Sequence, residues 1–221
     1  MMETAQRNPA LATGIIGAVA IAIAPLVEPR PFSLWVALLV IEAALTAGYV
    51  LGPWAYRHGL ATWESTIAGI VYIGLPLGFL TLVRVEANGA WWVVSILVIT
   101  WAYDTGAYLI GRAVGKRPFM HHISPSKTLE GVAGGLAASM IAGLVATVAI
   151  GVPVPAALAL GLGGGIVGQA GDLVESMFKR QSGVKDSGAI VPGHGGVLDR
   201  IDSLMFVTVL VYYASIALGH A

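Results

Sequence analysis

The chain has 221 residues, of which 57% are hydrophobic and 11% are charged, and its formal net charge is zero. Soluble globular domains carry about 25% charged residues, so this composition, with a mean hydropathy of +0.81, excludes a soluble domain and indicates an integral membrane protein. Cysteine is absent, which excludes disulfides and thiolate metal sites but fixes no compartment.

The first apolar segment covers residues 11–27 and follows a polar stretch that contains Arg7. A cleaved signal peptide is one interpretation, because Ala22 and Ala24 have the small-residue spacing of a cleavage site. Further apolar segments follow at once, so we interpret residues 11–27 as a first transmembrane helix, although a short one.

Three more membrane helices are predicted in the first half of the chain. They cover residues 32–51, 65–83 and about 91–110, and Pro76 is expected to kink the helix that contains it. Asp104 lies near the end of the last of these helices. A carboxylate within the membrane costs about 2.5–3.5 kcal/mol on insertion scales, so we expect Asp104 to have a function.

A polar loop, residues 111–131, follows this helix. Its basic side chains are Arg112, Lys116, Arg117 and Lys127. His121 and His122 also lie in this loop, and two adjacent residues cannot face the same way on a helix. We therefore interpret the two histidines as a surface pair.

Three further helices are predicted at residues 128–150, 156–174 and 204–218, the last of which is longer if it begins near Leu198. Glycines spaced four residues apart predict close helix packing: Gly131 and Gly135, Gly161 and Gly165, and Gly164 and Gly168. The Gly-rich run at residues 162–165 could also suggest a nucleotide-binding loop. No strand precedes it, so helix packing is the better interpretation.

The most polar part of the chain, residues 176–202, has one pair of carboxylates just before it and another at its end. Asp172 and Glu175 are three residues apart, so on a helix they share one face, and Asp199 and Asp202 repeat this spacing. Carboxylates suit Mg²⁺, and proteins hold nucleotide phosphates with Mg²⁺ together with Lys and Arg.

Between the two pairs, residues 192–196 read Pro-Gly-His-Gly-Gly, which indicates a turn that opens into the next helix. Glycines let the backbone approach an anion closely, and a helix N-terminus presents free N–H groups to it. The alternative is an ordinary solvated loop, which the density of opposite charges in this short stretch disfavours.

The stretch resembles the signature of the phosphatidate cytidylyltransferases, also called CDP-diacylglycerol synthases. The residues that match the signature, with its spacing, are Ser176, Phe178, Lys179, Arg180, Lys185, Asp186, Gly188, Pro192, His194, Gly195, Gly196, Val197, Asp199, Arg200, Ile201 and Asp202. A second block of the family looks similar to Asp104, Thr105, Gly106, Ala107, Tyr108, Gly111, Arg112, Ser124, Pro125, Ser126, Lys127, Thr128, Glu130 and Gly131. Val191 and Ser126 depart from the residues that the family more often has. The resemblance extends from about Trp101 to the C-terminus.

The resemblance implies transfer of CMP from CTP to phosphatidate, which gives CDP-diacylglycerol and pyrophosphate. The catalytic residues that it implies are Lys179, Arg180, Lys185, Asp186, His194 and Arg200. The substrate-binding residues are Arg112, Ser124, Lys127, Ser176, Gly195 and Gly196. The implied metal is Mg²⁺, with a second cation as an option, held by Asp172 and Asp199 with Asp104 and Asp202 nearby. The implied partners are the lipid bilayer and a second copy of the chain, with no nucleic acid.

Counting Lys and Arg predicts the orientation in the membrane. With seven helices, ten of these residues fall on the side of the N-terminus, and Arg30 and Arg84 fall on the other. The positive-inside rule therefore places the N-terminus and both polar loops in the cytoplasm, as expected for a multi-pass protein of the cell inner (plasma) membrane. We expect an all-α polytopic fold and one membrane domain over residues 1–221, with N-terminal helices at 11–83 and a catalytic part at about 91–221.

Two other functions remain open from the residues alone. One is a related CTP-dependent membrane transferase that acts on an isoprenoid or ether lipid. The other is a transporter, which would carry polar positions around the membrane midplane. Here Glu42 is the residue nearest the middle of a span, and the other charges gather on one side, which disfavours a transporter.

Overall fold

The computed structural model describes residues 11–51, 59–184, 187, 196 and 198–219. In these residues the regular structure is helical. The elements are α1 (Leu11–Ile23), η1 (Ala24–Leu26), α2 (Pro31–Leu51), α3 (Gly59–Gly69), η2 (Ile70–Gly74), α4 (Leu75–Val85), α5 (Gly89–Val114), α6 (Leu129–Thr147), η3 (Val148–Ile150), α7 (Val154–Gln181) and α8 (Leu198–Ala217). The predicted all-α fold is confirmed.

Five of these helical segments are long and apolar enough to cross a membrane: Pro31–Val50, Thr62–Val85, Gly89–Val114, Leu129–Ile150 and Val154–Gln181. Two shorter apolar helices, Leu11–Leu26 and Ile201–Ala217, correspond to the first and last segments predicted from the sequence. The chain is therefore a multi-pass membrane protein, and seven crossings stay a prediction.

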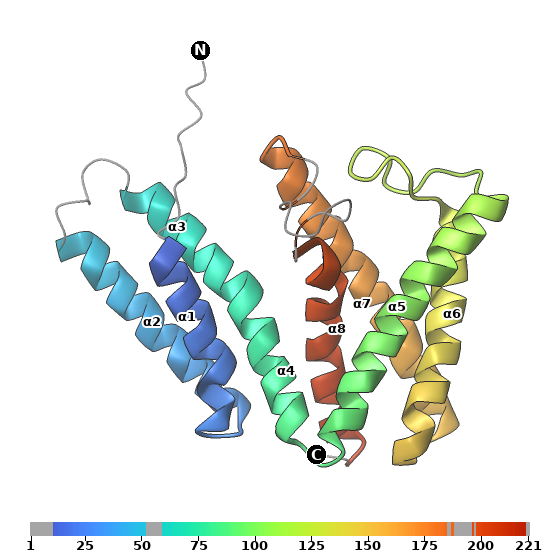
Figure 1. Cartoon of the computed structure of the whole chain (residues 1–221), viewed down its shortest axis with the longest axis horizontal. Coiled ribbons are helices and arrows are strands. Elements are labelled where there is room, and N and C mark those ends of the chain that lie inside the picture. The colour runs from blue at the N-terminus through green and yellow to red at the C-terminus, as the bar shows by residue number, and fades with distance from the viewer. Residues whose placement is uncertain (1–10, 52–58, 185–186, 188–195, 197, 220–221) are drawn as a thin grey trace. The chain divides into compact units, whose positions relative to one another are not determined.

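The chain divides into two compact units, Met1–Val85 and Glu86–Ala221. The first holds α1 to α4 and the second holds α5 to α8 (Figure 1). This boundary lies between the N-terminal helices and the catalytic part that the sequence indicated. A single membrane domain over the whole chain stays a prediction.

In the first unit, the helix around Pro76 widens into a π-helical turn, η2, just before the proline. Proline has no N–H, so the carbonyl four residues earlier loses its normal helical donor. A π turn shifts the pairing by one residue and so accommodates the proline within one continuous segment. This π turn is the distortion that the structure describes at Pro76, and the predicted kink stays a prediction.

Small residues bring the helices of the second unit close together. An added Cβ at Gly135 would lie 2.9 Å from the carbonyl oxygen of Tyr103, and one at Gly143 would lie 2.7 Å from that of Ala157. Such distances are too short for any side chain, so glycine at these positions permits α5 to pack on α6, and α6 on α7. The predicted packing role of the glycines is confirmed.

Two helices of the second unit extend further than predicted, and the last one has the longer of its two predicted extents. α5 continues to Val114 rather than about residue 110, α7 continues to Gln181 rather than about 174, and α8 begins at Leu198. The 28 residues of α7 span about 42 Å, which exceeds the hydrocarbon core of about 30 Å. Asp172 consequently lies within α7 and not at its end, and the last turns of α7 form a polar extension.

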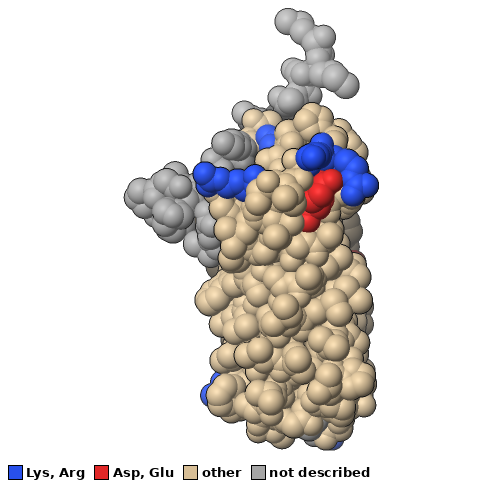
Figure 2. All heavy atoms as spheres, turned by 90° about the vertical axis from the view of Figure 1, so that its right-hand side faces the viewer, with Lys and Arg blue, Asp and Glu red and all other residues tan. Residues whose placement is uncertain are grey.

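The polar ends of these helices gather at one end of the second unit. The C-terminal ends of α5 and α7 and the N-terminal ends of α6 and α8 lie at that end (Figure 1). Seen from the side of α5 and α6, Lys, Arg and acidic side chains cluster at this end, and the middle of the face shows uncharged residues (Figure 2). On α6, apolar side chains such as Ile141 and Val145 are exposed, as suits contact with lipid.

Candidate active site

The loop between α5 and α6 folds back on itself as a short hairpin. Phe119 N–H donates to the Lys127 carbonyl at 2.8 Å, and Leu129 N–H donates to the Arg117 carbonyl at 2.9 Å. The Thr128 side chain accepts from Gly131 N–H at 3.1 Å and so caps α6. These bonds fix the backbone on both sides of Lys127. His121 and His122 are exposed in this loop, as predicted for a surface pair.

Glu130, in the first turn of α6, holds the start of the same hairpin. Its carboxylate accepts from the backbone N–H groups of Lys116 at 3.1 Å and Arg117 at 3.2 Å. The Arg117 Nε atom adds a third bond at 2.9 Å. Glu130 thus joins the end of α5 to the beginning of α6 and positions the loop that carries Lys127.

Glu130→Ala is expected to loosen this hairpin and to lower any activity that depends on Lys127 several-fold. The loss of the acceptor for two backbone N–H groups should also speed tryptic cleavage after Lys116 and Lys127 in the membrane-embedded protein. Arg117→Ala is the matched control, because it removes only the exposed partner and keeps both backbone bonds. Equal cleavage rates in Glu130→Ala and the wild type would contradict this role.

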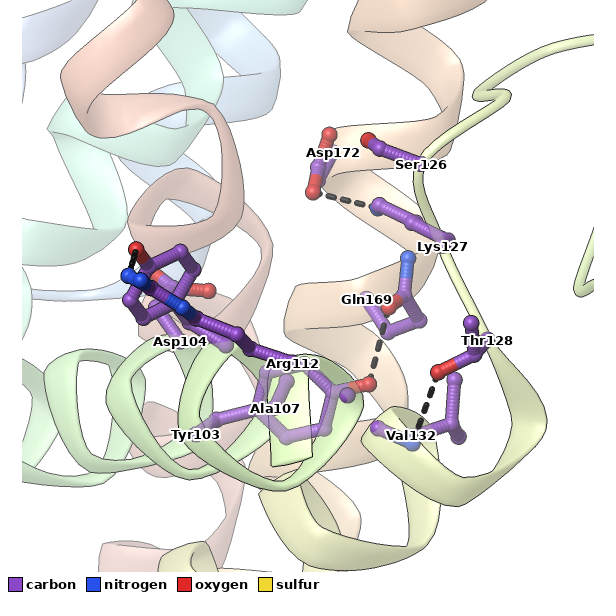
Figure 3. Close-up of a pocket in the computed structure, with 13 residues that line it drawn as sticks. Tyr103, Asp104, Ala107, Arg112, Ser126, Lys127, Thr128, Val132, Gln169 and Asp172 are labelled. Atoms are coloured by element: carbon purple, nitrogen blue, oxygen red, sulfur yellow. Dashed lines mark hydrogen bonds and ion pairs between the residues drawn. The ribbon is translucent and has the colours of Figure 1, made fainter. Parts of the chain in front are cut away.

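A pocket of about 380 Å³ lies between α5, the hairpin, α6 and α7 (Figure 3). Its charged lining residues are Asp104, Arg112, Lys127 and Asp172. The Lys127 ammonium forms an ion pair with the Asp172 carboxylate across the pocket, and Ser176 donates to Asp172 at 3.3 Å. Lys127 of the first polar loop therefore meets Asp172, which lies on α7 just before the second polar stretch.

Two residues that the sequence analysis missed, Tyr103 on α5 and Gln169 on α7, also line the pocket. The Tyr103 hydroxyl donates to Gln169 Oε1 at 2.8 Å, and both side chains are buried. Gln169 is the one amide side chain in the predicted helix at residues 156–174. A polar residue in such an apolar helix was the signal that could have identified it.

A second polar cluster lies where α7 meets the start of α8. Lys179 Nζ contacts Glu175 Oε2 and Asp199 Oδ1, each at 2.7 Å. Glu175 is 2% exposed, and its other oxygen, Oε1, has no hydrogen-bond partner among the described residues. Asp202 lies next to this cluster, 8% exposed, and accepts from Ser203 N–H at 2.6 Å. One lysine thus balances two carboxylates of this cluster.

Asp199 also anchors the end of the second polar loop. Its Oδ2 atom accepts from Ser187 N–H at 2.9 Å, the Ser187 hydroxyl at 2.8 Å and Gly196 N–H at 2.7 Å. Burial works to raise the pKa of Asp199, but the ammonium of Lys179 and these N–H and hydroxyl donors outweigh it and hold the pKa well below its usual range. Asp199 is therefore ionised and fully hydrogen-bonded.

Three of the four carboxylates predicted as metal ligands lie near one another. The charges of Asp104, Asp172 and Asp202 act on each other, which links α5, α7 and α8. Asp199 is instead surrounded by donors, so it could bind a metal ion only by exchanging one of them. No group of three or more His, Asp or Glu side chains in the described ranges is arranged to hold a metal ion.

The remaining predicted residues lie at the edge of the site or outside the described residues. Arg112 donates to the Tyr108 hydroxyl at 2.9 Å, and Arg180 is exposed, with its Nε 3.5 Å from the Ile123 carbonyl. Ser124 is half-buried in the hairpin. The predicted residues outside the described ranges are Lys185, Asp186, His194 and Gly195, together with the side chain of Arg200. Their roles stay predictions.

The fold and the site define a helical multi-pass membrane protein with clustered carboxylates and cations at one end of its helices. A sequence model described as the cytidylyltransferase family matches residues 1–217. The chain is 38% identical over 204 residues to the phosphatidate cytidylyltransferase of Staphylococcus saprophyticus, which covers 90% of this chain and 77% of that relative. It is 36% identical, with the same coverage, to the proteins of that name from Staphylococcus haemolyticus and Staphylococcus aureus strain COL. The chain belongs to the cytidylyltransferase family, which confirms the resemblance seen in the sequence.

Proposed function

We propose that this protein is a phosphatidate cytidylyltransferase, which transfers CMP from CTP to phosphatidate and releases pyrophosphate. The observation that carries the proposal is the family match over residues 1–217, nearly the whole chain. The names of the relatives supply the lipid substrate. The position of the pocket agrees with this activity, because it lies at the polar ends of membrane helices, where a lipid headgroup lies.

In the proposed reaction, a phosphate oxygen of phosphatidate attacks the α-phosphorus of CTP. A new P–O bond forms, and the bond from the α-phosphorus to the oxygen bridging the α- and β-phosphates breaks, so that pyrophosphate leaves with that electron pair. A phosphate monoester is anionic near neutral pH, so no strong general base is required. The side chains would act mainly by positioning the two substrates and neutralising charge.

Lys127 and Arg112 are the cations that line the pocket, and we propose that they bind phosphate oxygens. Lys179 already contacts Glu175 and Asp199, so its main role is to hold α7 against the start of α8. Lys185 and Arg200 are proposed, from the family signature, to add positive charge toward the leaving pyrophosphate.

The carboxylates of the site fit Mg²⁺, which prefers oxygen ligands and needs only one or two carboxylates besides substrate phosphates. Asp172 is the best placed, because it lines the pocket and its side chain is 31% exposed. Asp104 lines the same pocket, and Oε1 of Glu175, which has no hydrogen-bond partner among the described residues, is a further carboxyl oxygen. When bound, Mg²⁺ would neutralise and orient the triphosphate. The role of Asp199 as the second ligand stays a proposal from the family signature.

The test uses the full chain, purified in detergent and supplied with CTP, Mg²⁺ and phosphatidate. The expected products are CDP-diacylglycerol and pyrophosphate in equal amounts. Polyprenyl phosphate and an ether-lipid phosphate replace phosphatidate in parallel reactions. Product with one of these lipids and none with phosphatidate would replace the proposed function by that of the related transferase.

We further propose that the N-terminus and both polar loops face the cytoplasm, in the cell inner (plasma) membrane. A reporter fused after Lys116, or within residues 181–185, is expected to read cytoplasmic, and one fused after Ala221 to read external. The reason is the excess of Lys and Arg on the side of these loops. A cytoplasmic reading at Ala221 would require an even number of crossings and would contradict this topology. A homodimer is proposed from the family resemblance alone.

A further inference from the structure

Gln169 presents an unused hydrogen-bond donor at the wall of the pocket. It lies on α7, three residues before Asp172, and is 8% exposed. Its Oε1 atom accepts from the Tyr103 hydroxyl at 2.8 Å, while its Nε2 atom is buried and has no partner among the described residues. Figure 3 shows the amide nitrogen on the side of the pocket that faces Lys127, away from Tyr103.

Tyr103 can keep the amide in this orientation because the backbone of α6 and α7 packs closely against its ring at two glycines. A Cβ atom at Gly135 would lie 2.8 Å from Cε2 of Tyr103, and one at Gly165 would lie 3.0 Å from Cδ2. α6 and α7 therefore approach the ring as closely as backbone allows, and its hydroxyl has a fixed place. The Tyr103 hydroxyl thus holds the Gln169 oxygen and leaves the two N–H bonds on the side of Lys127.

A buried amide N–H without an acceptor is unfavourable, because it loses its hydrogen bonds to water and gains none. Its position indicates what the acceptor is. Lys127 and Arg112 line the same pocket, so an anionic oxygen bound there would be attracted by both cations. A phosphate group supplies several acceptor oxygens, and one of them can accept from Gln169 while others contact the cations.

We propose that Gln169 Nε2 donates a hydrogen bond to a phosphate oxygen of a substrate in the pocket, and that Tyr103 is the positioning residue that orients the amide. The inference rests on the proposed function for the identity of the substrates, CTP and phosphatidate. Both carry phosphate, so the chemistry is shared, and the experiment separates the two sources.

The experiment compares the wild type with Gln169→Met, Gln169→Glu and Tyr103→Phe, all as full-length protein in detergent. Met keeps the length of the side chain but has no donor, and Glu replaces the donor by a negative charge. Equilibrium binding of CTP alone and of phosphatidate alone is measured first, followed by KM for each substrate. Thr147→Val is the control, because it removes a buried hydroxyl from the opposite end of α6.

Gln169→Met is expected to weaken the binding of one substrate about tenfold or more, as for loss of a hydrogen bond to a charged group. Gln169→Glu should weaken it further, and Tyr103→Phe should have a smaller effect of the same kind, since the amide remains but is no longer oriented. Thr147→Val should bind both substrates as the wild type does. If only CTP binding is weakened, the acceptor of the Gln169 hydrogen bond is a phosphate oxygen of the nucleotide. If only phosphatidate binding is weakened, the acceptor is the phosphate of the lipid.

Unchanged binding and KM for both substrates in Gln169→Met would overturn the inference, even if that variant unfolded at a lower temperature, because Gln169 would then only support Tyr103. A wild-type protein that binds neither compound would overturn it too. The proposed function can fail separately. If the wild type binds CTP or phosphatidate through Gln169 but forms no CDP-diacylglycerol, the inference stands and the proposed reaction does not.

Discussion

Asp172→Asn is expected to lower CDP-diacylglycerol synthesis by roughly a hundredfold to a thousandfold, the range for losing a well-placed electrostatic group at an active site. The Asp172 carboxylate faces the pocket, is partly exposed and forms the ion pair with Lys127. An amide of nearly the same shape cannot offset the charge of Mg²⁺ or of Lys127. The measurement is the initial rate of product formation with purified protein over a range of Mg²⁺ concentrations.

Asp199→Asn and Asp202→Asn are the comparisons within the same group of carboxylates. Asp199→Asn should also nearly abolish activity, and it should lower stability because Ser187, Gly196 and Lys179 lose a charged acceptor. Asp202→Asn should have a smaller effect if that residue only supports the site. The proposal for the metal site fails if Asp172→Asn keeps the wild-type rate at saturating Mg²⁺, or if the wild type stays active after exhaustive EDTA treatment.

The second large effect is expected from Lys179→Met, which keeps the length of the side chain and removes its charge. Lys179 is the ion-pair partner of both Glu175 and Asp199, and the three side chains are 18%, 2% and 10% exposed. Removing one member of a buried ion pair leaves an uncompensated charge and costs about 3 kcal/mol or more. The measurement is the free energy of unfolding in detergent, by titration with a denaturant.

Two variants test whether this cost arises from the unpaired carboxylates. Arg180→Met changes an exposed neighbour in the same way and should alter stability by less than about 0.5 kcal/mol. The double variant Lys179→Met/Glu175→Gln should recover part of the loss, because the buried charge is removed together with its partner. A Lys179→Met protein as stable as the wild type would show that the Lys179 contacts contribute nothing to the fold.

Much of the site could be predicted because its signals are local in the chain. The spacing of Asp172 and Glu175, and the signature around Lys179 and Asp199, lie within short stretches of sequence. Helix periodicity places such residues on one face without knowledge of other elements. The glycine spacing around Gly135 similarly predicted close packing, which α5 and α6 show.

The helix ends were less predictable, because a prediction from hydropathy alone places the end of a helix where polar residues begin. The predicted end of the sixth helix near residue 174 was wrong for this reason, since α7 continues to Gln181. Its last turns contain good helix formers, and Lys179 and Arg180 complement the negative end of the helix dipole. Those turns carry Lys179 to the start of α8, where it contacts Asp199.

The sequence by itself determined that this protein is an all-α membrane protein of the cytidylyltransferase family with its charges gathered in two loops. Only the tertiary structure decided which charges meet. Lys127 and Asp172 are 45 residues apart, and Tyr103 and Gln169 are 66 apart. Neither pair has a local signal, because each depends on how closely α5, α6 and α7 pack. That distance is set by glycines whose missing side chains leave space for another helix, and their partners cannot be read from the chain.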